Sequence, residues 1–142
     1  MYLRLAGEYG TRQAVLDTGA PACILTKQAW GPLHQRGGIQ WVCHAPDLSP
    51  HKDLPRFKFL QGYYPYRVGR VEIQPVDHLD TSRTLKSRLV LALCLEDERE
   101  NPSDPESLPR LLVVGMAEIL NGRTLTLTVS PDGNEWAGSL AE

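Results

Sequence analysis

Alternating apolar and polar residues recur along the chain in short runs. They occupy residues 2–5 and 123–129, further strand-like runs stand at residues 11–16 and 39–43, and the run at residues 88–95 is apolar throughout after Arg88. Alternation with a period of two is typical of a β-strand with one buried face, and the continuous run indicates a strand buried on both faces. Turn-forming residues separate the runs. The pattern therefore predicts an all-β fold.

The first two runs predict a β-hairpin. Glu8-Tyr9-Gly10 separates residues 2–5 from residues 11–16 and favours a turn. The second strand of this hairpin carries Asp17 at its far end, and Ile24-Leu25 follows as a further short strand. We expect Asp17 to lie where the chain leaves one strand and turns toward the next.

Two short helical segments are expected between the strands. Thr26 suits the N-cap of a single helical turn, which Gly31-Pro32 is expected to stop. Gly37-Gly38 is expected to loosen the chain before the next strand. Residues 116–120 predict one short helix in the second half of the chain, ended by Asn121-Gly122, because both residues tolerate positive φ. The run at 123–129 is then expected to close the sheet.

Residues 56–73 predict another hairpin, and two polar segments predict loops. Residues 45–55 and 96–109 each contain three prolines, and the second segment is also strongly acidic. Such a composition cannot pack into a core, so residues 96–109 are expected to form an exposed, flexible loop.

Length and charge narrow the class of protein. A chain of 142 residues fits a single domain, 1–142, that buries roughly 68% of its unfolded surface. A net charge of −2 with both signs scattered argues against a basic nucleic-acid-binding face. The sequence has neither an apolar run of about 18 residues nor a signal-peptide pattern. We therefore expect a soluble, cytoplasmic protein whose partner is a polypeptide, with no nucleic acid and no membrane.

Cysteine and histidine positions do not suggest a metal site. Cys23, Cys43 and Cys94 leave one cysteine unpaired in any disulfide scheme and lack metal-binding spacing. Reduced thiols are expected, and Cys23 reads as a small buried apolar residue although it lies close to Asp17. The four histidines are scattered through polar segments. No metal and no other cofactor is expected.

Two distant motifs carry the functional information. Asp17-Thr18-Gly19-Ala20 lies between two apolar strands, and residues 111–115 form an apolar run that ends in glycine before the helical segment at 116–120. Together they resemble the retropepsins, the retroviral-type aspartic proteases. The resemblance implies a closed-barrel-like acid-protease lobe with one short helix. Taken alone, Asp-Thr-Gly also reads as an ordinary turn, since Asp and Gly are common turn formers.

The resemblance implies an endopeptidase that uses two carboxyl groups and no cofactor. Water must be deprotonated while the scissile carbonyl is polarised, and two carboxyls that share one proton do both. In aspartic proteases two such groups, about 3 Å apart, cannot both ionise, so their pKa values separate. One lobe supplies one carboxyl, so activity would require a homodimer with a two-fold axis between the two copies of Asp17.

The other site residues are assigned by the same resemblance. Gly19 would let the backbone approach closely, Thr18 would hydrogen-bond across the dimer, and Ala20 would keep the floor of the site small. The hairpin at 56–73 would be a flap that closes over substrate, although it also reads as an ordinary hairpin with half-buried tyrosines. The residues expected to contact substrate are Ile24, Leu60, Gly62, Tyr63 and Val114.

Some features depart from the retroviral pattern. Pro21 stands where those enzymes have an acidic residue, and Met116 where they have arginine. Neither belongs to the carboxyl pair, so activity survives in principle while substrate binding need not be similar. The tail at 136–140 is a candidate interface strand. Asp80-Thr81-Ser82 imitates a second active-site loop, but Arg83 follows it and no apolar strand precedes it, so we interpret it as a polar turn.

Two other functions are compatible with the sequence. One is a non-catalytic binding or dimerisation module with the same fold. The other is a monomeric sheet protein with a fortuitous Asp-Thr-Gly and a different ligand. The intact Asp17-Thr18-Gly19 favours the aspartic endopeptidase.

Overall fold

The protein is mostly β-structure. The computed structural model describes residues 1–17, 20, 22–59, 62–77, 79–80, 82–96, 112–115, 119–134 and 136–142. The strands are β1 (Tyr2–Leu5), β2 (Arg12–Asp17), β3 (Cys23–Leu25), β4 (Ile39–Cys43), β5 (Arg56–Phe59), β6 (Gly62–Val76), β7 (Arg88–Leu95), β8 (Leu112–Gly115), β9 (Thr124–Val129) and β10 (Trp136–Ala141). The helices in these residues are α1 (Lys27–Gln35) and the 3₁₀-helix η1 (His51–Asp53).

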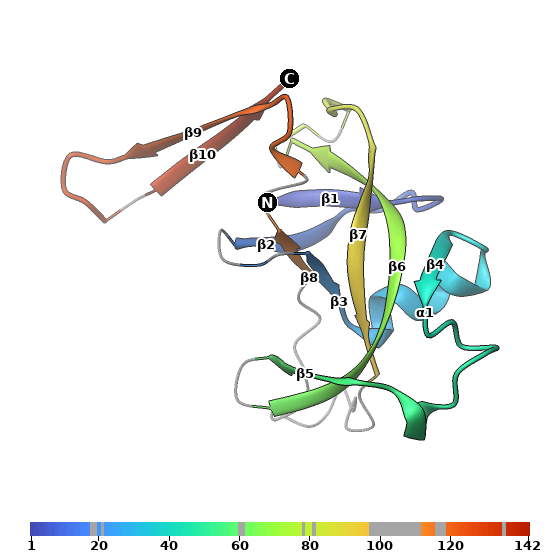
Figure 1. The fold of residues 1–142 in the computed structure, drawn as a ribbon. Coiled ribbons are helices and arrows are strands. Elements are labelled where there is room, and N and C mark those ends of the chain that lie inside the picture. Colours follow the sequence, from blue (N-terminus) through green and yellow to red (C-terminus); the bar gives the residue numbers. More distant parts are fainter. Residues whose placement is uncertain are drawn as a thin grey trace.

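Eight of these strands form one sheet. Its order is β1-β2-β8-β3-β7-β6-β4, with β5 paired to the start of β6. β1 also pairs with the far end of β6, so the pairings lead from β1 through β2, β8, β3, β7 and β6 back to β1 (Figure 1). The predicted hairpin of β1 and β2 is present, with Tyr2 opposite Gln13. Strands from both halves of the sequence are therefore interleaved.

The main core lies on the inner face of this sheet. Its buried members are Leu3, Leu5, Ala14, Cys23, Leu25, Ala29, Trp30, Leu33, Ile39, Val71, Ile73, Val90, Ala92, Cys94, Val114 and Ile119. The expectation that residues 88–95 are buried on both faces is wrong. Val90, Ala92 and Cys94 are buried, but Leu89 is 47% exposed, because the outer face of β7 is left partly open to solvent.

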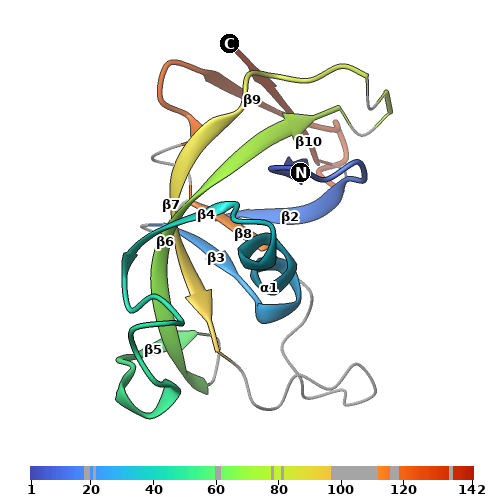
Figure 2. The same cartoon turned by 90° about the vertical axis from the view of Figure 1, so that its right-hand side faces the viewer.

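Helix α1 corrects the prediction of a single turn that stops at Gly31-Pro32. The helix passes through both residues and ends at Gln35. Its buried side chains Ala29, Trp30 and Leu33 pack into the main core, and Trp30 Nε1 donates to the Leu95 carbonyl at 2.8 Å. Tertiary packing therefore outweighs the cost of a proline inside the helix. Figure 2 shows α1 beside β4, on one side of the strands.

The two glycines after α1 end the helix in a defined way. Gly37 has a φ of 71°, its N–H donates to the His34 carbonyl, and the Gly38 N–H donates to the Leu33 carbonyl. This pair of bonds is a Schellman motif, which satisfies the last helical carbonyls. Gly37-Gly38 thus forms a helix cap rather than a loose connection.

The last two strands stand apart from the sheet. β9 was expected to close the sheet, but it pairs antiparallel with β10 over six residues, and in the described part of the chain these two strands form a separate sheet. Figure 1 shows this β9–β10 arm projecting from the body of the molecule. The expected acidic loop at 96–109 lies outside the described residues apart from Glu96, and the expected helix at 116–120 lies outside them apart from Ile119 and Leu120.

Candidate active site

Asp17 is the last residue of β2. β2 runs parallel to β8, and the pairing register sets Asp17 opposite Gly115. The side chain of Asp17 is exposed, whereas Ala14 in the same strand is buried. The N–H of Ala20 donates to the Asp17 carbonyl at 3.4 Å, so the chain turns immediately after the strand. Thr18, Gly19 and Pro21 lie outside the described residues.

β8 lies between the two strands that this turn connects. β2 pairs with one edge of β8, and β3 pairs with the other edge, where Ile24 lies opposite Val113. The connection from Asp17 to Cys23 must therefore cross the end of β8. It crosses at Gly115, where an added Cβ would lie 2.9 Å from the Ala20 carbonyl oxygen and 3.0 Å from Ala22 backbone atoms. Any larger residue here would force the backbone to shift, because the opposing atoms belong to the main chain and cannot rotate aside as a flexible side chain can.

An apolar row crosses the outer face of the sheet beside Asp17. The register pairs Val15 with Val113, Val113 with Ile24, and Ile24 with Leu93. Residues that are directly opposite point to the same face, so these four side chains form one row, called the outer row below. Val15 is 46% exposed, while Ile24 and Val113 are buried. Asp17, two residues after Val15, belongs to the same face.

The β5–β6 hairpin packs onto this outer row. Tyr64 is buried in a cluster with Ile24, Val113 and Leu95. Three partly buried side chains pack against this cluster: Ala20, Phe57 and Tyr66. Aromatic side chains of the hairpin and Ala20, which follows Asp17, therefore belong to one apolar cluster.

The two faces of this hairpin differ. Phe57 lies opposite Tyr64 on the packed face, whereas Lys58 lies opposite Tyr63, which is 64% exposed. Gly62 begins β6, and an added Cβ there would lie 2.8 Å from the Tyr64 hydroxyl oxygen. Gly62 therefore makes room for the Tyr64 side chain at the start of the strand.

The structure brings some of the predicted site residues together and separates others. Asp17 and Ala20 lie at the end of β8, and Ile24 lies opposite Val113 in the same strand. Val114 is fully buried in the main core, and Tyr63 lies on the face of the hairpin opposite to Tyr64. Leu60 lies outside the described residues.

Residues that sequence reasoning missed occupy this face instead. Val15, Val113 and Leu93 were not among the expected site residues, and Phe57 and Tyr66 were not distinguished from the rest of the hairpin. A signal was present for Val15, because a period of two places it on the face of Asp17. The sequence held no such signal for Leu93, whose place depends on pairing between strands that are distant in sequence.

A buried ion pair fixes the chain near the base of the β5–β6 hairpin. The Arg67 Nε donates to Glu96 Oε1 at 2.9 Å, and Lys27 Nζ lies 2.9 Å from Glu96 Oε2. Arg67 Nη1 also donates to the carbonyls of His44 and Ser49. Burial favours the neutral form of the Glu96 carboxyl, but the bonds from Lys27 and Arg67 outweigh it and lower its pKa.

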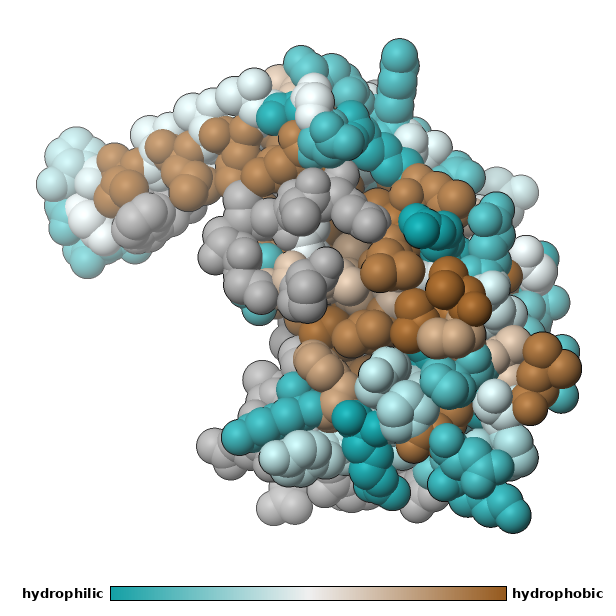
Figure 3. Space-filling model, in the orientation of Figure 1, coloured by the Kyte–Doolittle hydropathy of each residue, from teal (hydrophilic) through white to brown (hydrophobic). Residues whose placement is uncertain are grey.

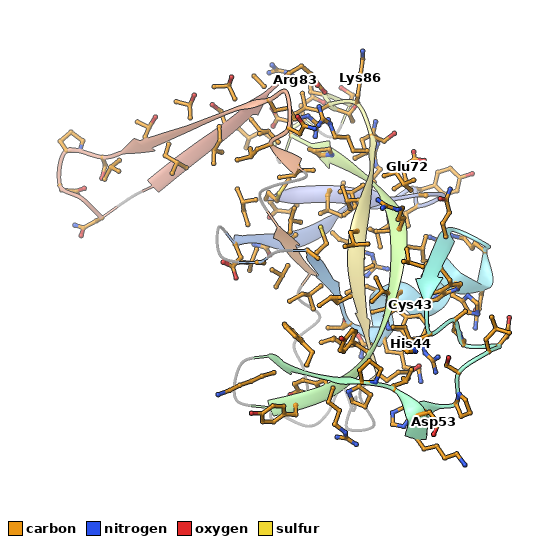
Figure 4. All side chains as sticks on the ribbon, in the orientation of Figure 1. Cys43, His44, Asp53, Glu72, Arg83 and Lys86 are labelled. Atoms are coloured by element: carbon orange, nitrogen blue, oxygen red, sulfur yellow. The ribbon has the colours of Figure 1, made fainter. Side chains whose placement is uncertain are left out.

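In the part of the chain that the structure describes, the cysteines and the other metal-ligating side chains do not gather into a metal site. Cys23 and Cys94 are both buried, and burial raises the pKa of the Cys94 thiol to about 12. Figure 4 shows Cys43, His44 and Asp53 well apart from Glu72, Arg83 and Lys86. Within the described ranges, His, Cys, Asp and Glu form no group of three or more that is able to hold a metal ion.

In the described residues, the structure contains no helix of the length and apolar character that crossing a membrane requires. Comparisons with family models, with curated proteins and with solved structures found no match for this chain.

Proposed function

We propose that the protein is an aspartic endopeptidase that acts as a homodimer, with Asp17 of each copy forming the catalytic pair. One observation carries the proposal. The strand order brings Asp17 opposite Gly115, and backbone atoms of Ala20 and Ala22 lie directly over that glycine. Two motifs from opposite ends of the sequence thus build one compact unit around a single carboxylate.

The chemistry follows from two such carboxylates sharing one proton. The ionised Asp17 takes a proton from water, which attacks the scissile carbonyl carbon. The protonated Asp17 of the second copy polarises the carbonyl oxygen and donates its proton to it. The first Asp17 then gives the leaving nitrogen the proton that it took from water, the carbon–nitrogen bond breaks, and the second Asp17 takes a proton back from a hydroxyl of the tetrahedral intermediate, so the pair again holds one proton. Like charges at close range separate the two pKa values, so the pair as a whole titrates in two steps.

The surroundings of Asp17 favour an extended polypeptide with apolar side chains as the substrate. Val15 of the outer row is exposed beside Asp17, and Figure 3 shows apolar side chains on this face of the body, where the molecule is hollowed. The β5–β6 hairpin packs on the same row through Tyr64. As a flap, it would hold the peptide and exclude water from the carboxyl pair.

The test compares two aspartates that occur in similar sequence contexts. Asp17→Asn removes the carboxyl pair with little change in volume, and cleavage of a peptide mixture should fall at least about 100-fold. Asp80→Asn is the matched control, because Asp80-Thr81-Ser82 repeats the Asp-Thr pair and Asp80 and Ser82 are exposed. Asp80 accepts hydrogen bonds from Ser82, as expected for a local turn. This variant should cleave like the wild type.

The assay should cover about pH 4 to 7, because a pair holding one proton works on the acid side of neutrality. Cleavage by the wild type that survives in Asp17→Asn would sink the proposal. So would a folded wild-type dimer that cleaves nothing in this range, and the non-catalytic binding module would then take its place.

A further inference from the structure

The exposed face of the β5–β6 hairpin carries positive charge. Arg56 and Lys58 stand on either side of Phe57 along β5, and Phe57 lies on the packed face, so both cations point to the opposite face. Tyr63 lies directly opposite Lys58 on this face and is 64% exposed. Arg56 and Lys58 are exposed as well. These three residues are called the cationic face below. Figure 3 shows hydrophilic side chains below the hollow, where the hairpin lies.

The two cations of this face have no counter-ion in the hairpin. Residues 54–71 contain four basic residues and no aspartate or glutamate. Among them, Arg67 is buried and paired with Glu96. Within the described residues, neither Arg56 nor Lys58 forms an ion pair or a side-chain hydrogen bond. Charges on an edge strand commonly prevent pairing with a further strand, but this role does not explain the exposed Tyr63 beside them.

The base of the hairpin is fixed to the body of the molecule. The Glu96 N–H donates to the Pro65 carbonyl at 2.8 Å, and the Tyr66 N–H donates to the Pro55 carbonyl at 3.0 Å. The rings of Phe57 and Tyr66 pack edge to face, with centroids 6.2 Å apart. A surface that is held in place binds a partner with a smaller loss of conformational entropy than a mobile one. The cationic face is therefore presented in a defined position.

We propose that the cationic face binds acidic side chains of the polypeptide that the protein cleaves. The inference rests on the proposed function and names its class of substrate. Apolar side chains beside Asp17 suit the residues around the scissile bond, and Arg56 and Lys58 suit carboxylates farther along the same substrate. Tyr63 adds an aromatic surface against which the substrate packs. The unpaired positive charge also attracts an acidic polypeptide before contact.

The test is equilibrium binding of two fluorescein-labelled peptides that differ only in charge. Both have the same apolar centre, and their flanks carry glutamates in one peptide and glutamines in the other. Fluorescence anisotropy measures binding to the wild type and to Asp17→Asn at about pH 7, where the glutamates are ionised. The glutamate peptide should bind about 3- to 10-fold more tightly, as expected for two exposed ion pairs. Raising the salt concentration to about 0.5 M should remove most of this preference.

Neutralising the cationic face should abolish the preference. In the double variant Arg56→Gln/Lys58→Gln, the two peptides should bind equally. Arg83→Gln/Lys86→Gln is the matched control, because it also replaces one exposed arginine and one exposed lysine. Figure 4 shows Arg83 and Lys86 at the end of the molecule opposite to Asp53, which lies just before β5. The control should keep the preference for glutamate, and far-ultraviolet circular dichroism checks that each variant is folded.

The outcomes separate the cationic face from the catalytic proposal. Equal affinity of the wild type for the two peptides, a preference that survives in Arg56→Gln/Lys58→Gln, or an equal loss in the control would overturn the assignment. Peptide cleavage by the wild type is measured separately. A glutamate preference that depends on the cationic face, in a protein that never cleaves, supports this face and defeats the protease. Cleavage without any preference for glutamate does the reverse.

Discussion

At the scale of single residues, Gly115 links the two halves of the candidate site. Its missing side chain allows the backbone of Ala20 and Ala22 to pass over the end of β8. The position of the turn after Asp17 therefore depends on a residue that has no functional group of its own. A substitution at Gly115 should act on Asp17 through the backbone alone.

We predict that Gly115→Ala lowers the free energy of unfolding by about 1–3 kcal/mol and also abolishes peptide cleavage. The added Cβ would meet the carbonyl oxygen of Ala20 and the carbonyl group of Ala22, so the backbone there must shift. Chemical denaturation and the cleavage assay measure the two effects. Gly31→Ala is the control, since its Cβ meets nothing within 4 Å and lies inside α1. It should raise stability by about 0.5–1 kcal/mol and leave cleavage unchanged.

Alternation explains why some site residues were predictable at this scale and others were not. The Asp-Thr-Gly-Ala motif identifies Asp17 and Ala20 as site residues, and in the structure both lie at the end of β8. Val113 and Val114 have the same side chain. Which of the two lies on the face of Asp17 depends on which face of β8 meets the core. That face is set by the register with β2, a strand almost a hundred residues earlier in the chain. The sequence pattern of so short a strand does not contain this information.

At the scale of elements, strands were easier to predict than the helix. The bounds of β1, β4 and β7 follow directly from runs of alternating or apolar residues. α1 contradicts its local signals, because Gly31 and Pro32 are both poor residues for a helix interior. Burial of Trp30 and Leu33 supplies the missing stability, and that contribution comes from other elements.

We predict that Pro32→Ala stabilises the protein by about 1–3 kcal/mol, because alanine restores the N–H that proline lacks and removes the clash with the preceding turn. Thermal and chemical denaturation measure the change. Pro131→Ala, in the exposed connection between β9 and β10, is the comparison and should lower stability by about 0.5 kcal/mol through the freer unfolded chain. A loss of stability in Pro32→Ala would show that α1 depends on its proline.

At the scale of the whole molecule, the order of the strands could not be read from the sequence. β8 enters between β2 and β3, and β1 pairs with the far end of β6. Each pairing joins segments that are distant along the chain, so local patterns indicate that the strands exist but not which ones are neighbours. The same applies to the arm, because β9 has the pattern of a sheet-closing strand and pairs with β10 instead.

Glu96 connects several parts of the molecule by charge. It follows β7 directly, pairs with Arg67 in the middle of β6, and binds Lys27 at the start of α1. Through Arg67, the segment that carries His44 and Ser49 is held to the sheet. The Arg67 and Glu96 side chains are both buried, so removing one charge leaves the other without its partner in a poorly solvated place.

We predict that Glu96→Gln lowers the free energy of unfolding by about 3 kcal/mol at neutral pH. Denaturation of the wild type, of this variant and of Glu72→Gln, whose carboxyl is exposed on β6, measures the effect. Glu72→Gln should change stability little. Equal stability of the wild type and Glu96→Gln would mean that Arg67 is adequately held by the two carbonyls alone.

The contribution of Glu96 to the free energy of unfolding depends on pH with a definite sign, because the pKa of Glu96 is lowered in the folded protein. Its contribution is fully present above the unfolded pKa of about 4.3 and is lost as the pH falls through the lower, folded value, since the unfolded chain binds the proton first. The stability advantage of the wild type over Glu96→Gln should therefore persist down to about pH 4 and shrink below it.

An aspartic endopeptidase that works on the acid side of neutrality needs its fold intact in that range. Because its pKa is lowered, Glu96 stays ionised in the pH range of the proposed Asp17 pair, and its ion pairs with Lys27 and Arg67 keep α1, β6 and β7 joined there. A stability advantage of the wild type over Glu96→Gln that disappears already near pH 6 would contradict this link.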